Sequence, residues 1–163
     1  MAAGLLFLLC AAAVLFSSEA QDSYTELPGS YRQGVDLALE QLGSSHNVKL
    51  HFRFLRSVEK REHEGYMSAK LLYHHFYLKP TSCPKGTAIS DSQRCSFRND
   101  RPLMDCLVCY KTVEEQMEPS PPPYVHCIQK PRLTQDMRTK RLDYWNKLTY
   151  KTGSATTLAL SSG

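Results

Sequence analysis

The stretch around which this chain is organised runs from Thr81 to Cys127 and reads TSCPKGTAISDSQRCSFRNDRPLMDCLVCYKTVEEQMEPSPPPYVHC. Every cysteine beyond the first twenty residues lies in it: Cys83, Cys95, Cys106, Cys109 and Cys127. Strand-like runs at 103–113 and 124–129 alternate in it with patches of turn-forming residues. Short strands, tight turns and several cysteines are typical of small secreted domains that disulfides stabilise.

The first twenty residues predict a secretory signal peptide. Leu5 to Phe16 is an uncharged apolar run, too short to cross a bilayer core of about 30 Å as a helix. Ser18 and Ala20 are small residues at the −3 and −1 positions of a cleavage site before Gln21. We therefore expect residues 1–20 to be removed and the mature chain to be secreted into the extracellular space; the alternative is a buried N-terminal helix.

Charge divides the mature chain into two parts. Residues 21–127 carry 13 Lys/Arg and 13 Asp/Glu, whereas residues 128–163 carry 7 Lys/Arg and 2 Asp/Glu, a net charge of +5. We predict a folded domain over 21–130 and a flexible basic C-terminal tail over 131–163 that proteases process. The tail has a loosely helical apolar stripe, but Lys140 and Arg141 interrupt it, and we expect disorder from Thr152 onward.

The order of the remaining patterns predicts an α+β domain. Ser30 with Gln33 forms a capping-box pattern at the start of an amphipathic helix, and Gly43 is a suitable residue beyond its end. Its apolar face consists of Tyr31, Val35, Ala38, Leu39 and Leu42. A strand over 48–54 alternates apolar and basic residues, 59–65 forms a charged connection, and a central strand over 67–79 is apolar on both faces. With the two cysteine-bearing strands, this predicts one helix packed on a four-stranded antiparallel sheet.

The cysteine spacing limits the disulfide pairing. Cys83 with Cys95 closes a turn-rich loop. Cys106 and Cys109 would be about 10 Å apart along one strand, at ~3.3 Å per residue, whereas bridged Cα atoms lie within about 7 Å. One of these two cysteines is therefore expected to bond Cys127 and the other to be left over, either buried or paired with a second chain.

We find no pattern that points to catalysis or to a cofactor. Cys106 and Cys109 with His126 and Cys127 resemble a zinc ligand set, but in a secreted chain disulfides are favoured over zinc. His74 and His75 are expected on opposite faces of a strand. The sequence has no glycine-rich phosphate loop and no evident Ser–His–Asp arrangement. We expect no enzyme activity, no metal, no cofactor and no nucleic-acid partner.

Several of these segments resemble the cathelicidin and cystatin-like superfamily. The resemblance lies in SYRQGVDLALEQL (30–42), VKLHFRF (48–54), PTSC (80–83), the spacing C-x11-C-x10-C-x2-C and VHC (125–127), so it covers about residues 30–127. It implies a cystatin-like fold with bridges Cys83–Cys95 and Cys106–Cys127. In similar proteins the counterpart of Cys109 bonds a cysteine in the tail; no cysteine follows Cys127 here, which leaves Cys109 unpaired.

The same resemblance implies a function. The most similar members are secreted chemoattractant and adipokine precursors, which extracellular serine or cysteine proteases trim at the C-terminus. The trimmed forms activate a G-protein-coupled receptor in leukocyte chemotaxis, inflammation and adipocyte differentiation and metabolism. Tyr150-Lys-Thr-Gly153 keeps the Tyr-x-x-Gly frame of their active peptide, while Ala155 and Thr157 replace phenylalanines. The residues expected to bind the receptor are Tyr144, Trp145, Tyr150 and Gly153, with processing near Thr157 and Leu158, in a monomer.

Two other functions stay open. A cathelicidin-type antimicrobial precursor would release a cationic, membrane-active tail, and the basic tail is suited to contact anionic membrane or glycosaminoglycan. A cystatin-type protease inhibitor would need a Gln-x-Val-x-Gly hairpin and a Pro-Trp hairpin. The hairpin at 59–65 lacks the first motif, and the only tryptophan, Trp145, lies in the tail.

Overall fold

The computed structural model describes residues 23–92 and 94–153. Its elements in chain order are η1 (Tyr24–Glu26), α1 (Gly29–Ser44), β1 (Leu50–Glu64), β2 (Ala69–Pro84), α2 (Ile89–Ser92), β3 (Met104–Val113), β4 (Gln116–Met117), β5 (Tyr124–Gln129), η2 (Lys130–Arg132) and α3 (Gln135–Gly153). The expected signal peptide and the processing region at Thr157 and Leu158 lie outside the described residues.

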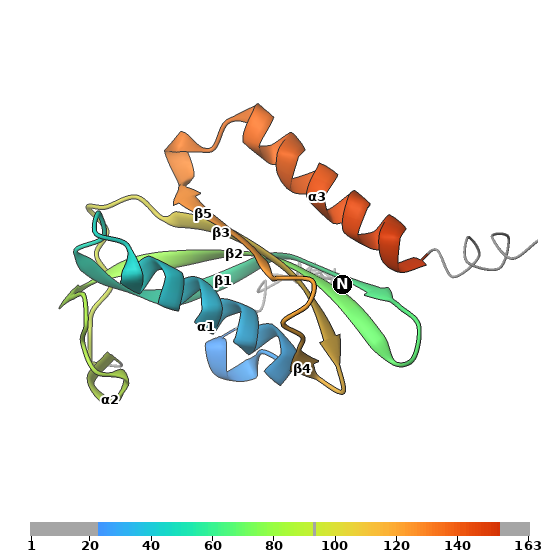
Figure 1. Cartoon of the computed structure of the whole chain (residues 1–163). Helices are drawn as coiled ribbons and strands as arrows, with labels where there is room; N and C mark the ends of the chain where they lie inside the picture. Colours follow the sequence, from blue (N-terminus) through green and yellow to red (C-terminus); the bar gives the residue numbers. More distant parts are fainter. Residues whose placement is uncertain (1–22, 93, 154–163) are drawn as a thin grey trace, which may run out of the picture.

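The strands form one antiparallel sheet between two helices. β2 lies between β1 and β3, and the far edge of β3 pairs with β5 along most of its length and with the short β4 at its end. Helix α1 covers one face of this sheet and α3 lies across the other (Figure 1). The α+β class and the antiparallel sheet are confirmed; α3 is an element that the sequence analysis did not expect.

Helix α1 packs its expected apolar face on the sheet, but its ends differ from the prediction. Tyr31, Val35 and Ala38 are buried in the larger core. The capping box is wrong: the helix begins at Gly29, and Ser30 is buried inside the first turn. The helix also continues through the expected stop at Gly43 to Ser44.

The side chain of Gln33 has a tertiary partner in place of the expected helix cap. Its Nε2 donates to the carbonyl oxygen of Glu115 over 2.7 Å, and its Oε1 accepts from the backbone amide of Met117 over 2.8 Å. These two hydrogen bonds attach α1 to the β3–β4 turn.

The first strand is much longer than the prediction, because β1 continues through the charged segment that was expected to be a connection. β1 is an edge strand and pairs only with β2 among the described residues, so one of its edges faces solvent and tolerates charge. The register between β1 and β2 shifts at three places. Charged side chains and such irregularities protect a sheet edge from pairing with other chains. The hairpin turn therefore lies at 65–68.

The central strand has the two faces that its alternation predicted. Leu72 and Phe76 belong to the core under α1, whereas Leu71 and Tyr73 belong to a second cluster under α3. The two adjacent histidines also lie on opposite faces of β2. The centroid of the His74 ring lies 5.1 Å from that of the Tyr31 ring, on the α1 side.

The disulfides form with the pairing that the family resemblance implied. Cys83 bonds Cys95, with S–S 2.05 Å, and Cys106 on β3 bonds Cys127 on β5, with S–S 2.06 Å. Cys109 lies on the opposite face of β3 from Cys106 and is a free, buried thiol.

The expected flexible tail is wrong over the part that the structure describes. Residues 135–153 form α3, which buries Arg141, Trp145 and Leu148 against the sheet. Thr152, where disorder was expected to begin, is helical. Arg141 does not interrupt the buried stripe of the helix; it belongs to it, because a carboxylate lies beneath it.

Candidate functional site

Aromatic and aliphatic contacts hold α3 on the sheet. Trp145 packs edge-on against Tyr73 of β2, with ring centroids 5.5 Å apart. Tyr144 stacks on Tyr124 of β5 at 4.3 Å. Leu148 joins Trp145 over Leu71, Leu107 and Cys109 in one buried cluster. Burial of a tryptophan and a leucine contributes several kcal/mol, about 1.5–3 for a leucine side chain alone.

Arg141 adds a polar anchor next to these rings. Its side chain is only 5 % exposed, and Nη1 donates to Oδ1 of Asp105 on β3 over 2.5 Å. Nη2 donates to the main-chain oxygens of Asp105 and His126, both over 3.1 Å, while Nε donates to Nδ1 of His126 over 2.8 Å. His75 Nε2 lies 3.0 Å from the same Asp105 oxygen. The guanidinium thereby binds α3 to β3 and β5 at once.

This environment shifts two ionisable groups in the same sense. Burial alone would raise the pKa of Asp105, but hydrogen bonds from His75 and Arg141 outweigh it and lower that pKa. Burial lowers the pKa of His126, and the charge of Arg141 lowers it further. The docked helix therefore favours a charged Asp105 and a neutral His126.

The free thiol lies under the same helix. Burial raises the pKa of Cys109 to about 12, and the positive charges of Arg141 and Arg61 offset this only in part. A thiol with such a pKa is protonated at neutral pH and is a poor nucleophile. Cys109 therefore fits a packing role beneath α3.

The outer face of α3 is open to solvent near its C-terminal end. Tyr150 is 75 % exposed, and it lines a shallow hollow together with Asp143, Asn146, Lys147 and Lys151. Among the described residues of α3, Tyr150 is the aromatic side chain with the greatest exposure. It lies at the end of the helix from which the chain continues toward residue 163.

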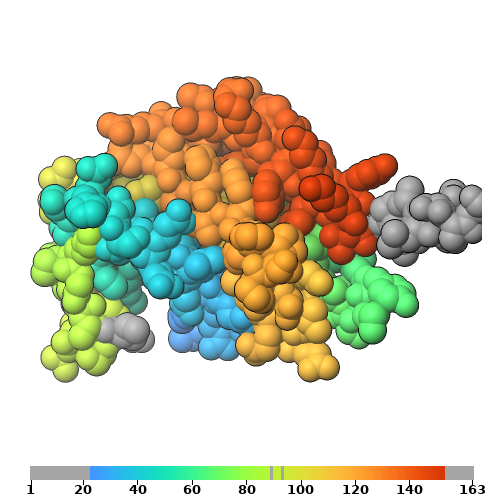
Figure 2. All heavy atoms as spheres, viewed as in Figure 1, coloured from blue at the N-terminus to red at the C-terminus, as the bar shows by residue number. Residues whose placement is uncertain are grey.

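The β1–β2 turn lies beside this end of α3. A Cβ placed on Gly65 would lie 3.1 Å from Cγ2 of Thr152, so the two segments are in contact (Figure 2). At the tip of the turn, Tyr66 is 74 % and Met67 77 % exposed. Met67 and Ser68 have φ values of 55° and 60°, a left-handed conformation that costs non-glycine residues free energy. The exposed tip of the β1–β2 turn thus lies at the same end of the molecule as the C-terminal end of α3.

The residues expected to bind a receptor fall into two groups. Trp145 is buried and Tyr144 is half-buried, so both hold α3 in place. Tyr150 is exposed, and Gly153 is the last residue of α3. The sequence analysis missed Tyr66 and Met67 because it placed the hairpin at 59–65; the Gly65-Tyr66-Met67-Ser68 break between two strand patterns was the available signal.

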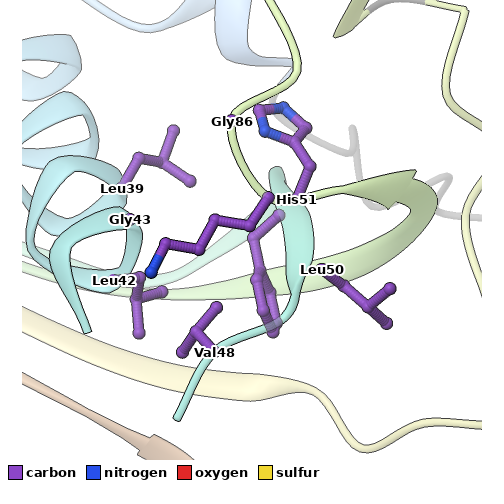
Figure 3. Close-up of a pocket in the computed structure, with 9 residues that line it drawn as sticks. Leu39, Leu42, Gly43, Val48, Leu50, His51 and Gly86 are labelled. Carbon is purple, nitrogen blue, oxygen red and sulfur yellow. The ribbon is translucent and has the colours of Figure 1, made fainter. Parts of the chain in front are cut away.

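A second hollow lies between the end of α1 and the start of β1 (Figure 3). Leu39, Leu42, Val48 and His51 are among the residues that line it, and its volume is about 60 Å³. Pockets for drug-sized ligands have volumes of about 300–1,000 Å³. The hollow is too small for such a ligand, and we read it as a packing defect at the helix end.

Two further features, a metal site and a membrane-spanning helix, are absent from the described part of the chain. No cluster of three or more His, Cys, Asp or Glu side chains in ranges 23–92 and 94–153 is arranged to hold a metal ion. No helix within these ranges is both long and apolar enough to cross a membrane.

No protein-family model matches the chain, and a search of curated proteins found no significant match.

Proposed function

We propose that this protein is a secreted ligand precursor of the chemerin type, with a cystatin-like fold in the cathelicidin and cystatin-like superfamily. After C-terminal proteolysis it activates a G-protein-coupled receptor in leukocyte chemotaxis and inflammation, and in adipocyte differentiation and metabolism. The family resemblance of residues 30–127 supports this proposal. Two disulfides, which are typical of proteins from oxidising compartments, support the extracellular location.

One observation carries the proposal: α3 is docked on one side and presents Tyr150 on the other. Trp145 and Arg141 hold the helix on the sheet, while Tyr150 is exposed at its C-terminal end. Exposed aromatic side chains on a rigid support are frequent anchors of protein recognition. The domain thus serves as a platform for a receptor-binding segment that begins near Tyr150.

Proteolysis acts beyond this platform. Cleavage after Thr157 removes Leu158 to Gly163 and leaves a short segment attached to the end of α3. Because the buried contacts of α3 end at Leu148 and Thr152, such a cut leaves the docked helix intact. Extracellular serine or cysteine proteases are the activating partners in this proposal.

The test compares receptor calcium signalling or leukocyte chemotaxis for the full chain, a form ending at Thr157, and the shorter form with Tyr150→Ala. The form ending at Thr157 is expected to be the most active, and Tyr150→Ala to reduce its activity strongly. Arg138→Ala, an exposed change on the same helix, is the matched control. Equal activity of the Tyr150→Ala and Arg138→Ala forms would contradict the proposal.

A second candidate function is a cathelicidin-type antimicrobial precursor. The observation that favours it is the composition of α3, which combines an apolar face containing Trp145 and Leu148 with exposed Arg138, Lys147 and Lys151. Amphipathic cationic helices bind anionic membranes. If a peptide of residues 131–163 lyses anionic vesicles at low salt and no form of the protein signals, this function replaces the first.

A further inference from the structure

Basic side chains lie over aromatic rings on the part of the α3-side sheet face next to the docked helix. The guanidinium of Arg53 lies 5.2 Å and the ammonium of Lys79 lies 5.6 Å from the Phe97 ring centroid. Arg56 and Lys130 lie 5.0 and 4.8 Å from the Tyr77 ring centroid. We name these residues the basic–aromatic patch: Arg53, Arg56, Tyr77, Lys79, Phe97 and Lys130.

The sheet register makes the patch continuous. Tyr77 and Lys79 are two residues apart on β2 and therefore share a face. Across the ladder Arg53 pairs with Lys79, and Arg56 pairs with Tyr77. Phe97 comes from the loop that follows the Cys83–Cys95 bridge. Segments far apart in the chain thus place four cations around two neighbouring rings, Tyr77 and Phe97.

The positive charge of the patch is not neutralised within the described ranges. Arg53 donates to the carbonyl oxygen of Cys95 over 3.2 Å, and Lys79 donates to Oδ1 of Asn99 over 2.6 Å; both acceptors are neutral. In ranges 23–92 and 94–153, the four cations of the patch form no ion pair with a carboxylate.

The carboxylates near the patch already have cationic partners. Glu59 is paired with Arg61, and Asp100 is paired with Arg98. Asp105, which lies opposite Tyr77 in the sheet, is paired with Arg141. The patch therefore presents uncompensated positive charge to an anionic partner.

We propose that the basic–aromatic patch binds a sulfated polysaccharide chain. The rings hold the cations in place through cation–π contacts, so less side-chain freedom is lost when sulfate groups bind. Phe97, 37 % exposed, adds an apolar surface for the face of a sugar ring. Several cations on one face of the sheet match the repeated sulfates of an extended chain better than they match a single small anion.

The patch differs from the basic tail that the sequence suggested for this contact. In α3, Arg141 is buried against Asp105, and Lys140 is paired with Asp136 over 2.8 Å. Within the part of the chain that the structure describes, none of the remaining cations of α3 lies over an aromatic ring. The cations that aromatic rings hold in place therefore lie on the sheet side of the molecule and not on α3.

The experiment measures binding of the full chain to heparin at physiological salt, by affinity elution and by titration. Arg56→Ala with Lys130→Ala removes two exposed cations of the patch, and Arg138→Ala with Lys147→Ala removes two from α3 as a charge-matched control. We expect the patch variant to bind about tenfold more weakly or worse, and the control to bind within about twofold of the natural chain. Melting temperatures verify that both variants fold.

Three results would overturn the proposal. The first is no binding of the natural chain at physiological salt, and the second is an equal loss in the two variants, which would mean that net charge alone drives binding. The third is a different preferred partner. Either equal binding to desulfated heparin or tighter binding to vesicles of anionic phospholipid would show this. Because this readout involves no receptor, it is independent of the signalling test.

Discussion

Arg141 on α3 donates to the carboxylate of Asp105 on β3, and both side chains are almost fully buried. The two residues are 36 positions apart in the chain. Their pairing brings a charged helix residue into an otherwise apolar interface, where Trp145 and Leu148 lie one and two turns further along. Together with the contacts of Trp145 and Leu148, this pair holds α3 on the sheet.

Replacing Arg141 by methionine should destabilise the protein strongly. The change leaves Asp105 as a buried carboxylate without its main partner, which costs about 3–5 kcal/mol in comparable cases. Urea unfolding measures the free energy. Arg138→Met on the exposed side of the same helix is the control and should change stability by less than about 0.5 kcal/mol. The double variant Asp105→Asn, Arg141→Met should recover part of the loss; equal stability of the two single arginine variants would contradict the contact.

Acid should loosen α3 before the domain unfolds. The pKa of His126 is lowered in the folded protein. Neutral His126 therefore stabilises the docked helix above about pH 6.5, the ordinary pKa of histidine. This stability is lost as the pH falls below that value. Asp105, whose pKa is also lowered, adds a second loss below about pH 4. Trp145 is the only tryptophan, so its fluorescence should shift to the red with falling pH. In His126→Gln, which keeps an acceptor for Arg141, the first step should disappear; an unchanged titration would rule out His126.

Cys109 should report on the docking of α3. Its pKa is raised to about 12 and it is buried, so a thiol reagent at pH 8 should label the native protein very slowly. Trp145→Ala weakens the cover above it and should accelerate labelling by at least about tenfold, while Arg138→Ala should not. Rapid labelling of the natural chain under native conditions would show that α3 does not shield this thiol.

The hairpin tip should contribute to receptor activation if the receptor contacts this end of the molecule. Tyr66→Ser with Met67→Ser removes two exposed apolar side chains next to the end of α3, so it should lower the potency of the form ending at Thr157 with little effect on its melting temperature. Val58→Ser, an exposed apolar residue elsewhere on β1, is the control. If only Tyr150→Ala reduces potency, the contact is limited to the helix and the segment after it.

Ser68→Gly should stabilise the protein. Ser68 has φ 60°, a region that glycine occupies without the cost that other residues bear, so the gain should be about 1 kcal/mol. The change is seen as a higher melting temperature. Ser82→Gly in β2 is the control and should lower stability, since glycine weakens a strand interior. A decrease for both variants would argue against left-handed backbone at Ser68.

Local patterns were sufficient for the two faces of the central strand and for the helix on the first face of the sheet, but not for the length of β1. The alternation along 67–79 correctly assigned Leu72 and Tyr73 to opposite faces, because the side-chain period of a strand is a property of the backbone alone. The same geometry excluded a bond between Cys106 and Cys109, and the family resemblance supplied the choice of Cys106 as partner of Cys127. Capping at Ser30 failed because the helix begins earlier, at Gly29, and the Gln33 side chain bonds Glu115 and Met117 instead.

Periodicity and chain distance were enough to predict the α+β class, the two faces of the central strand and the loop that Cys83 and Cys95 close. The helical state of residues 135–153 and the place of the basic–aromatic patch depend on contacts between segments far apart in the chain. A helical pattern shows Arg141 as a break in an apolar stripe, because the stripe carries no information about Asp105. Likewise Arg53, Tyr77 and Lys130 are far apart in sequence. They come together because β1, β2, β3 and β5 form one sheet and Lys130 directly follows β5.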